Sequence, residues 1–214
     1  MSADEAPRRR RGRPKAAEAG DTRGRILTAA AQEFSRHGYE AVSLRSVARA
    51  AGVDAALVHH YFEDKAELFT QSMGLPFRPD RLVHAALAGP REDVGANLLR
   101  AALASLDRPA ARTGVLGLLR TALGHEFAAE LLRQFLVREV LHRVAEELDL
   151  PDGELRATLT ASQLVGLVVL RYGIRAEPLA QASVEELVAR VGPVLQWHLL
   201  GFPDPLDPGE RPRE

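Results

Sequence analysis

Four residues of one short predicted helix have the size and polarity needed to read nucleic-acid bases. Ala55, Ala56, His59 and His60 form i, i+4 pairs on one side of this helix, whereas Val58 points to the other side. Alanines allow a helix backbone to lie close to base edges in the major groove, and histidines supply hydrogen-bonding groups there. The pattern predicts contact with DNA, and an ordinary half-buried structural helix is the alternative.

Patterns typical of catalysis are incomplete in this chain. The run HEFAAE at His125 begins like a zinc-binding helix, but Ala129 stands where the second histidine ligand is required. His142 and Glu146 share a helix face, which is typical of an ordinary ion pair. The sequence contains no cysteine, no Gly-x-Ser-x-Gly elbow and no phosphate-binding glycine loop. We therefore expect neither an enzyme nor a bound metal or cofactor.

Closely spaced helix boundaries position the short helix. Ser43 is the predicted N-cap of the preceding helix, which ends at Gly52, and Asp54 is the predicted N-cap of the short helix itself. Asp64, with Glu67 three residues later, begins the next helix in an aspartate form of the capping box. Two short helices joined by a tight turn have the spacing of a helix-turn-helix motif.

Positive charge is concentrated at the start of the chain. Residues 1–25 contain eight Lys or Arg and four Asp or Glu, whereas the remaining residues contain 20 and 25. A basic arm of this kind indicates a polyanionic partner or a solvated leader. Within RRRRGRPK, the run Arg11-Gly12-Arg13-Pro14 is similar to the AT-hook core, whose arginines enter a narrow A·T minor groove. Groove insertion of Arg11 and Arg13 and nonspecific electrostatic steering are both open.

Helical periodicity continues to about residue 200 without a strand pattern, which predicts an all-α chain. We expect a disordered basic arm over 1–20, a helix-turn-helix domain over 21–72, a larger helical domain over 73–201 and a disordered tail over 202–214. The longest apolar stretch, Leu164 to Leu170, is far shorter than the roughly 20 residues of a membrane helix. The sequence therefore predicts a cytoplasmic protein with no membrane partner.

Two long segments, 154–175 and 183–200, are so apolar that other helices must shield them from water. They belong either to the core of the monomer or to a four-helix interface between two copies. The residues alone leave both arrangements open.

Residues 23–69 resemble the N-terminal DNA-binding domain of the TetR family of bacterial transcriptional regulators. The shared features are Gly38 after the first helix, Ser43 before the second, Ala51-Gly52-Val53 at the turn, and Tyr61-Phe62 with Lys65 at the start of the fourth helix. The resemblance implies about nine helices, with the helix-turn-helix domain joined to a larger ligand-binding and dimerisation domain.

The resemblance also implies roles for individual residues. Arg45 would contact a base or its phosphate, and Ala55, Ala56, His59 and His60 would face the groove. Ser43, Tyr61 and Lys65 would hold the phosphate backbone. Departures from the family pattern are Asp54, where Ser or Thr is usual, and His59, where tyrosine is usual. Hydrogen-bonded readout by the third helix is therefore expected to be limited to the histidines.

Finally, the resemblance implies a homodimer through 154–175 and 183–200 and a small-molecule effector in the larger domain. The candidate effector-binding residues are Leu103, Leu106, Leu116, Leu119, Arg120, Phe127, Phe135 and Gln163. Ordinary core packing is the alternative for each of them. The expected function is a ligand-responsive regulator of double-stranded DNA, most simply a repressor that binds a palindromic operator as a dimer. The alternative is an architectural, effector-independent protein that prefers A·T-rich DNA.

Overall fold

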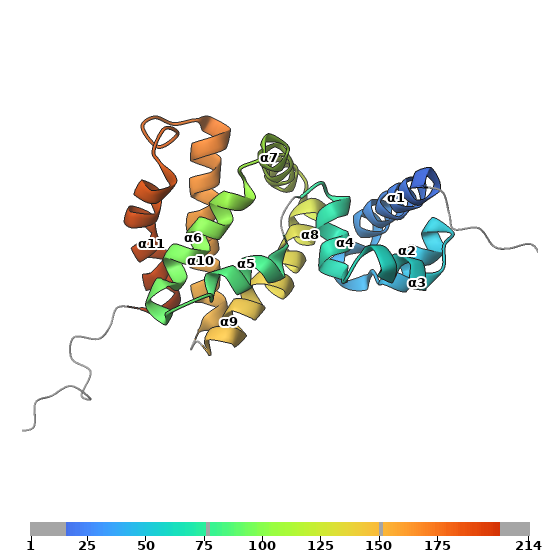
Figure 1. Cartoon of the computed structure of the whole chain (residues 1–214), viewed down its shortest axis with the longest axis horizontal. Helices are drawn as coiled ribbons and strands as arrows, with labels where there is room; N and C mark the ends of the chain where they lie inside the picture. Colours follow the sequence, from blue (N-terminus) through green and yellow to red (C-terminus); the bar gives the residue numbers. More distant parts are fainter. Residues whose placement is uncertain (1–15, 76–77, 150–151, 202–214) are drawn as a thin grey trace, which may run out of the picture.

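The computed structural model describes residues 16–75, 78–149 and 152–201. Within these ranges the chain forms helices and no β-strand, which confirms the all-α prediction. The elements in chain order are α1 (Ala16–Ala41), α2 (Leu44–Ala51), α3 (Ala55–Tyr61), α4 (Lys65–Ser72), α5 (Pro79–Ala86), η1 (Arg91–Asp93), α6 (Val94–Ser105), α7 (Pro109–Gly124), α8 (Glu126–Leu136), η2 (Val137–Leu141), α9 (His142–Leu148), α10 (Gly153–Val168), η3 (Val169–Ile174) and α11 (Val184–Leu200). Figure 1 shows α1–α3 at one end of the molecule, α10 and α11 at the other, and α8 between them.

The first helix is longer than its sequence pattern predicts. α1 begins at Ala16, before the domain boundary expected at residue 21, so residues 16–20 of the expected arm are helical. The helical run is interrupted at Gly38, whose φ of 80° and ψ of 172° favour a residue without a Cβ. Arg11, Arg13 and the other residues of the predicted basic arm up to position 15 lie outside the described residues.

The predicted caps fix the short helices. The Oγ of Ser43 accepts from the N–H of Ser46 at 3.0 Å, and the Oγ of Ser46 accepts in return from the N–H of Ser43 at 3.0 Å. Gly52 ends α2 in the left-handed region with a φ of 64°. The carboxylate of Asp54 accepts from the N–H of Ala56 at 2.7 Å and begins α3. These local bonds confirm the boundaries expected for the helix-turn-helix.

The fourth helix begins slightly differently from the prediction. The carboxylate of Asp64 accepts from the N–H of Glu67 at 2.7 Å, as expected for the N-cap. The carboxylate of Glu67, however, accepts at 2.7 Å from the N–H of Glu63, one residue before the N-cap. The reciprocal half of the capping box is therefore shifted by one residue, and it still satisfies a backbone donor at the helix start.

An aromatic cluster forms the core of the N-terminal part. Phe34 and Tyr39 of α1 pack against Phe69 of α4, with ring centroids 5.0 and 5.1 Å from the Phe69 ring. Phe135 of α8 completes the cluster at 4.6 Å from Phe69 and is fully buried. Because Phe135 comes from the C-terminal part of the chain, the two parts share one core.

In the C-terminal part, α6 packs closely on α11. A Cβ on Gly95 would collide with the backbone of Gly192, and a Cβ on Gly192 would lie 3.2 Å from the Cα of Ala96. The N–H of Gly95 donates to the Oε1 of Gln196 at 2.7 Å across this contact. Further along the chain, α8, η2 and α9 follow one another without a break, and α10 and η3 form the apolar segment 154–175.

The outer face of α10, η3 and α11 is apolar and exposed. Its large exposed side chains are Leu155, Leu159, Val165, Leu170, Ile174, Val194 and Trp197. By length and composition, Gly153–Ile174 is the one helix in the described part of the chain that could cross a membrane, and 22% of its most apolar window is buried. This finding differs from the expectation drawn from Leu164–Leu170, because apolar residues continue on both sides of that stretch.

Candidate functional site

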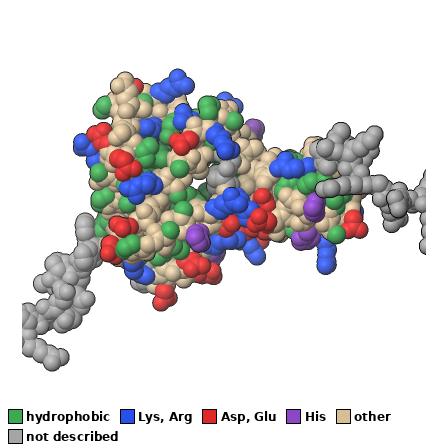
Figure 2. Space-filling model, viewed as in Figure 1, with side chains coloured by type: hydrophobic (Ala, Val, Ile, Leu, Met, Phe, Trp, Pro, Cys, Tyr) green, Lys and Arg blue, Asp and Glu red, His purple; other side chains and the backbone are tan. Residues whose placement is uncertain are grey.

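The exposed surface of α2 and α3 carries most of the residues predicted to contact DNA. On α3, Val58 faces the core and is fully buried. Ala56, His59 and His60 are exposed, and Ala55 is half-buried. Figure 2 shows histidine side chains on the surface at this end of the molecule. Both histidines therefore lie at the surface and not in the core beside Phe62.

On α2, Ser43 and Arg45 lie at the exposed N-terminal end. The Arg45 guanidinium has no hydrogen-bond or ion-pair partner among the described residues. Arg49 lies one turn further on, on the same exposed side, and also lacks such a partner there. Arg49 is not among the residues predicted to contact DNA, although its i, i+4 spacing from Arg45 is a signal visible in the sequence.

Tyr61 and Lys65, the two remaining residues predicted to contact phosphate, make contacts within the protein. Tyr61 is half-buried, and its ring lies 5.2 Å from the His60 ring. The Nζ of Lys65 donates to the backbone oxygen of Glu40 at 3.1 Å and lies 4.5 Å from the centre of the Tyr39 ring. Burial lowers the pKa of Lys65. Lys65 therefore faces the end of α1 in this conformation.

The C-terminal part contains an apolar cavity of about 160 Å³. Helices α6, α7, α8 and α10 and the segment η2 provide most of its wall. The lining residues are Leu75, Leu82, Ala102, Ser105, Leu106, Val115, Leu118, Leu119, Leu132, Leu136, Val140, Ala161, Leu164, Val165 and Val168. Ser105 is the only one of these with a polar side chain, so the cavity favours an uncharged ligand.

The residues predicted to bind an effector are dispersed in the structure. Leu106 and Leu119 line the cavity, whereas Leu103 is buried in the α6–α11 core. Leu116 faces a separate hollow beside Tyr172. The other four predicted residues do not line the cavity: Arg120, Phe127 and Gln163 are exposed, and Phe135 lies in the N-terminal aromatic core. Helical periodicity identified apolar faces without showing which of them surround empty space.

Helix α8 joins the cavity to the N-terminal part. Leu132 and Leu136 line the cavity and also pack against the aromatic core, in which Leu131 is buried. The Oε1 of Gln134 accepts from the N–H groups of Tyr39 and Glu40 at 3.0 and 3.3 Å. This side-chain amide satisfies backbone donors just after the interruption of α1 at Gly38.

A buried polar contact reinforces this junction. The hydroxyl of Tyr39 donates to the Oε1 of Glu139 at 2.9 Å, and Arg143 donates to the Oε2 of the same carboxylate at 2.7 Å. Burial, together with the neighbouring Glu139 charge, raises the pKa of Tyr39 far above its usual value of 10.0. The phenol therefore stays protonated and remains a hydrogen-bond donor.

Arg78 forms a second link between the two parts. Its guanidinium pairs with Glu63 before α4 at 2.8 Å, with Glu67 in α4 at 3.5 Å and with Asp80 in α5 at 3.0 Å. The Arg78 side chain is only 13% exposed. The hydrogen bond and charge of Arg78 lower the pKa of Glu63. These ion pairs join the start of α5 to α4 and to the turn that follows α3.

The zinc-like run at His125 can be compared with the arrangement of possible metal ligands in the structure. Among the described residues, no group of three or more His, Cys, Asp or Glu side chains is placed to hold a metal ion. His125 is exposed, and it forms the N-cap of α8 without a side-chain capping bond.

Comparisons with known proteins agree with this arrangement. The family model described as tetracyclin repressor-like, C-terminal domain, matches residues 92–199, and the model of bacterial regulatory proteins of the tetR family matches residues 26–71. The HTH-type transcriptional regulator BetI of Agrobacterium fabrum is 29% identical over 187 residues, which cover 84% of this chain and 88% of that protein. The HTH-type transcriptional regulatory protein RaaS of Mycobacterium tuberculosis is 54% identical over 44 residues, 21% of this chain and 20% of that protein.

A solved structure extends the similarity over nearly the whole fold. The crystal structure of a TetR-family regulator from Streptomyces coelicolor A3 is 34% identical and covers 88% of this chain and 98% of that chain, with a TM-score of 0.50. Both the helix-turn-helix and the C-terminal helices thus match this family in sequence. The chain therefore belongs to the TetR family of DNA-binding transcriptional regulators.

Proposed function

We propose that this protein is a ligand-responsive repressor that binds a palindromic operator as a homodimer. In this proposal, an uncharged small molecule enters the apolar cavity and releases the DNA. The observation that carries the proposal is the position of α8, whose Leu132 and Leu136 line the cavity while its Phe135 lies in the core beneath the helix-turn-helix. A ligand that moves α8 would therefore move the DNA-reading surface.

Readout of the operator is assigned to the exposed end of α2 and the outer side of α3. Arg45 has a guanidinium suited to guanine or phosphate, and His59 and His60 supply the hydrogen-bonding groups of α3. Ala55 and Ala56 let the helix approach the groove closely. Ser43, Tyr61 and Arg49 would hold the phosphate backbone, and Lys65 would join them after leaving the Glu40 carbonyl.

Dimerisation is assigned to the apolar outer face of α10, η3 and α11. An exposed apolar surface of this length is costly in water, and a second copy of the same face would cover it. The exposed positions Ser162 and Gly166 leave room between Leu159 and Leu170 for a helix of the partner. A two-fold dimer would present its recognition helices to half-sites about 34 Å apart.

The effector is expected to be uncharged and larger than the present cavity. A buried charge would be left without a counter-charge, and an organic cation would find no aromatic ring in the lining. A cavity near 160 Å³ holds about one aromatic ring, whereas binding sites for drug-sized ligands are roughly 300–1,000 Å³. A larger ligand must therefore displace the wall, which includes α8.

Selection of random duplex DNA by the purified full-length protein tests the proposal that the protein binds a palindromic operator. The expected product is an inverted repeat, whose recovery is reduced by Arg45→Ala and by His60→Ala. Arg100→Ala is the matched control, because Arg100 is exposed on α6 and pairs only with Glu185 among the described residues. Recovery of DNA without two-fold symmetry would contradict a dimeric operator.

Ligands of increasing size test the proposal that an uncharged effector binds in the apolar cavity and releases DNA. We expect benzene to raise the melting temperature without releasing DNA, and larger uncharged aromatic compounds to do both. Ala102→Phe should abolish these effects by filling the cavity, whereas Ala104→Phe on the exposed side of α6 should leave them intact. Equal inhibition by both substitutions would contradict binding in the cavity.

The architectural alternative is favoured by one observation, the basic run RRRRGRPK. Removal of residues 1–15 separates the two functions. For the repressor, the deletion should weaken binding and reduce its salt dependence while the inverted repeat is retained. For an architectural protein, the deletion should remove the preference for A·T-rich DNA and leave no selected sequence.

A further inference from the structure

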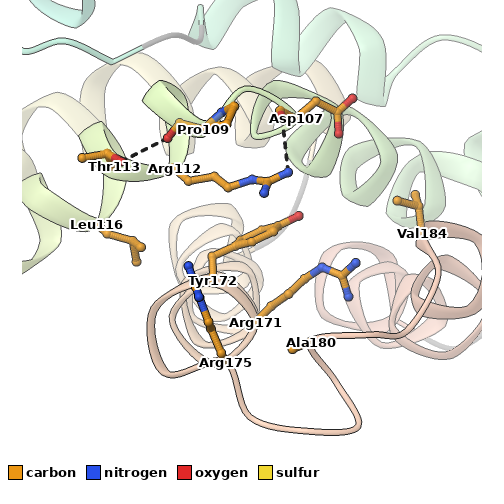
Figure 3. A pocket seen from close by; sticks show the side chains of 10 residues that line it. All are labelled: Asp107, Pro109, Arg112, Thr113, Leu116, Arg171, Tyr172, Arg175, Ala180 and Val184. Carbon is orange, nitrogen blue, oxygen red and sulfur yellow. Dashed lines mark hydrogen bonds between the residues drawn. The ribbon is translucent and has the colours of Figure 1, made fainter.

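A second hollow, of about 470 Å³, lies between the start of α7, the segment η3 and the connection to α11. Figure 3 shows three arginines, Arg112, Arg171 and Arg175, arranged around Tyr172. The remaining lining residues are Asp107, Pro109, Thr113, Leu116, Ala180 and Val184. This hollow combines concentrated positive charge with small apolar surfaces, unlike the apolar cavity.

Backbone contacts hold two of the guanidinium groups in place. Arg112 donates to the backbone oxygens of Leu106 at 2.6 Å and Asp107 at 3.2 Å. Arg171 donates to the backbone oxygen of Leu179 at 2.6 Å. The guanidinium carbons of Arg112 and Arg171 lie 4.7 and 5.5 Å from the centre of the Tyr172 ring. The positive groups are thus ordered before any ligand arrives.

The charges of the three arginines are not neutralised within the described part of the chain. No carboxylate there lies within ion-pairing distance of any of them. Asp107 lines the hollow, but Figure 3 shows its carboxylate directed away from Arg112. The Tyr172 hydroxyl makes no hydrogen bond to another described residue. Three like charges at one site disfavour one another unless a counter-charge is present.

One polar atom in this cluster is both buried and unsatisfied. The Nε of Arg171 has no hydrogen-bond partner, and it is the only such buried side-chain nitrogen or oxygen in the residues that the structure describes. A buried donor without an acceptor is costly, and because this Nε is closed to solvent here, an acceptor in the hollow would reach it only after the Arg171 side chain turned toward the hollow. The partner that fits three guanidinium groups and a phenol is an oxyanion.

We propose that this hollow binds the carboxylate or phosphate group of a small organic anion. Planar guanidinium groups match both oxyanions in bidentate geometry, and the Tyr172 hydroxyl supplies one further donor. Pro109, Leu116 and Val184 provide an apolar wall for the organic body.

This site is independent of the apolar cavity and of the DNA-binding surface. A core cluster of Leu106, Ala111 and Val168, with Val115, Leu116 and Tyr172 packed on it, lies between the two pockets. Figure 1 places α7 and the α10–α11 connection in the C-terminal part, away from α2 and α3. The occupant is therefore a small anion rather than a phosphate of the operator.

Calorimetric titration of the full-length protein at constant ionic strength tests the proposal. The probes are benzoate, phenyl phosphate and inorganic phosphate, with benzyl alcohol as the uncharged counterpart. At least one of the two organic anions should bind saturably, and the tighter of them identifies the preferred oxyanion. Benzyl alcohol should not bind at this site. Binding of inorganic phosphate alone, or of none of the anions, would overturn the proposal.

Matched variants locate the binding. Arg175→Gln and Arg112→Gln should each weaken the organic anion at least tenfold. Arg81→Gln should not, because Arg81 is exposed on α5 and does not line the hollow. Arg175 is exposed, and its side chain forms no hydrogen bond or ion pair with another described residue, so its variant remains informative if Arg112→Gln unfolds. Equal weakening by Arg81→Gln, or none by Arg175→Gln, would contradict the assigned site.

Discussion

The aromatic core of the N-terminal part and the apolar cavity of the C-terminal part meet at the same helix but are filled differently. On the core side of α8, Phe135 is fully buried against Phe69 and Tyr39. On the cavity side, Leu132 and Leu136 border about 160 Å³ of space. A close-packed contact resists displacement, whereas a cavity wall can yield to a ligand. In the proposed function, α8 is therefore suited to carry movement from the cavity to the proposed DNA-binding surface.

The largest expected effect comes from removing the Phe135 ring from the core-facing side of α8. Phe135→Ala should lower the free energy of unfolding by about 3–5 kcal/mol, because it leaves a void beside the rings of Tyr39 and Phe69. Phe127→Ala is the control on the same helix, since the Phe127 side chain is 47% exposed. Denaturant unfolding measures both variants. Similar losses for the two substitutions would show that the core side of α8 is no more tightly packed than its surface.

The helix-turn-helix was predictable because its signals are local. Ser43, Gly52 and Asp54 act within a few residues of their own positions, and each forms the cap that its sequence context predicts. The exposed positions of His59 and His60 follow from the helical period once Val58 is known to be buried. The shifted capping box at Asp64 differed by one residue, because the Glu67 side chain reaches either of two adjacent backbone donors.

The junction at α8 was not predictable in the same way. Gln134 contacts the backbone of Tyr39 from 95 positions away, and no local pattern links these two residues. Phe135 was predicted to line a ligand site because it lies on an apolar helix face, which is equally true of a residue that packs against another domain. The arginine hollow also forms from distant segments, since Arg112 lies in α7 and Arg171 in η3.

The second prediction concerns the polar part of the junction. Tyr39→Phe removes the donor to the buried Glu139 carboxylate and should cost about 1–3 kcal/mol in unfolding free energy. Tyr172→Phe is the matched control, because the Tyr172 hydroxyl has no hydrogen-bond partner among the described residues. Thermal and denaturant unfolding compare the two variants. No difference between them would mean that packing alone holds α8 to the N-terminal core.

The third prediction separates stability from DNA binding. Ser43→Ala and Ser183→Ala each remove an N-cap, from α2 and α11 respectively, and each should cost about 1 kcal/mol. Only Ser43→Ala should also weaken operator binding, because Ser43 lies on the proposed DNA surface. Unfolding measurements and DNA titrations on the same samples distinguish the two effects. Equal DNA affinity for both variants would contradict a phosphate contact by Ser43.

The smallest expected effect concerns pH and the Arg78 link. Arg78 lowers the pKa of Glu63 through its hydrogen bond and charge, below the ordinary value of 4.5. A folded-state pKa below the unfolded one contributes stability above the unfolded value, and this contribution is lost as the pH falls through the folded value. Glu63→Gln should therefore reduce the loss of thermal stability below about pH 4.5, by a small amount because Glu63 is exposed to solvent.

Glu92→Gln is the control for this measurement, since Glu92 is exposed and forms no ion pair within the described residues. The melting temperature of Glu63→Gln should be slightly lower than that of Glu92→Gln at neutral pH, and the two should converge as the pH falls to about pH 3. If the curves coincide, Arg78 retains its position through Glu67 and Asp80 alone. In that case the link between α5 and the turn after α3 does not depend on Glu63, and α8 is the main connection between the cavity and the DNA-binding surface.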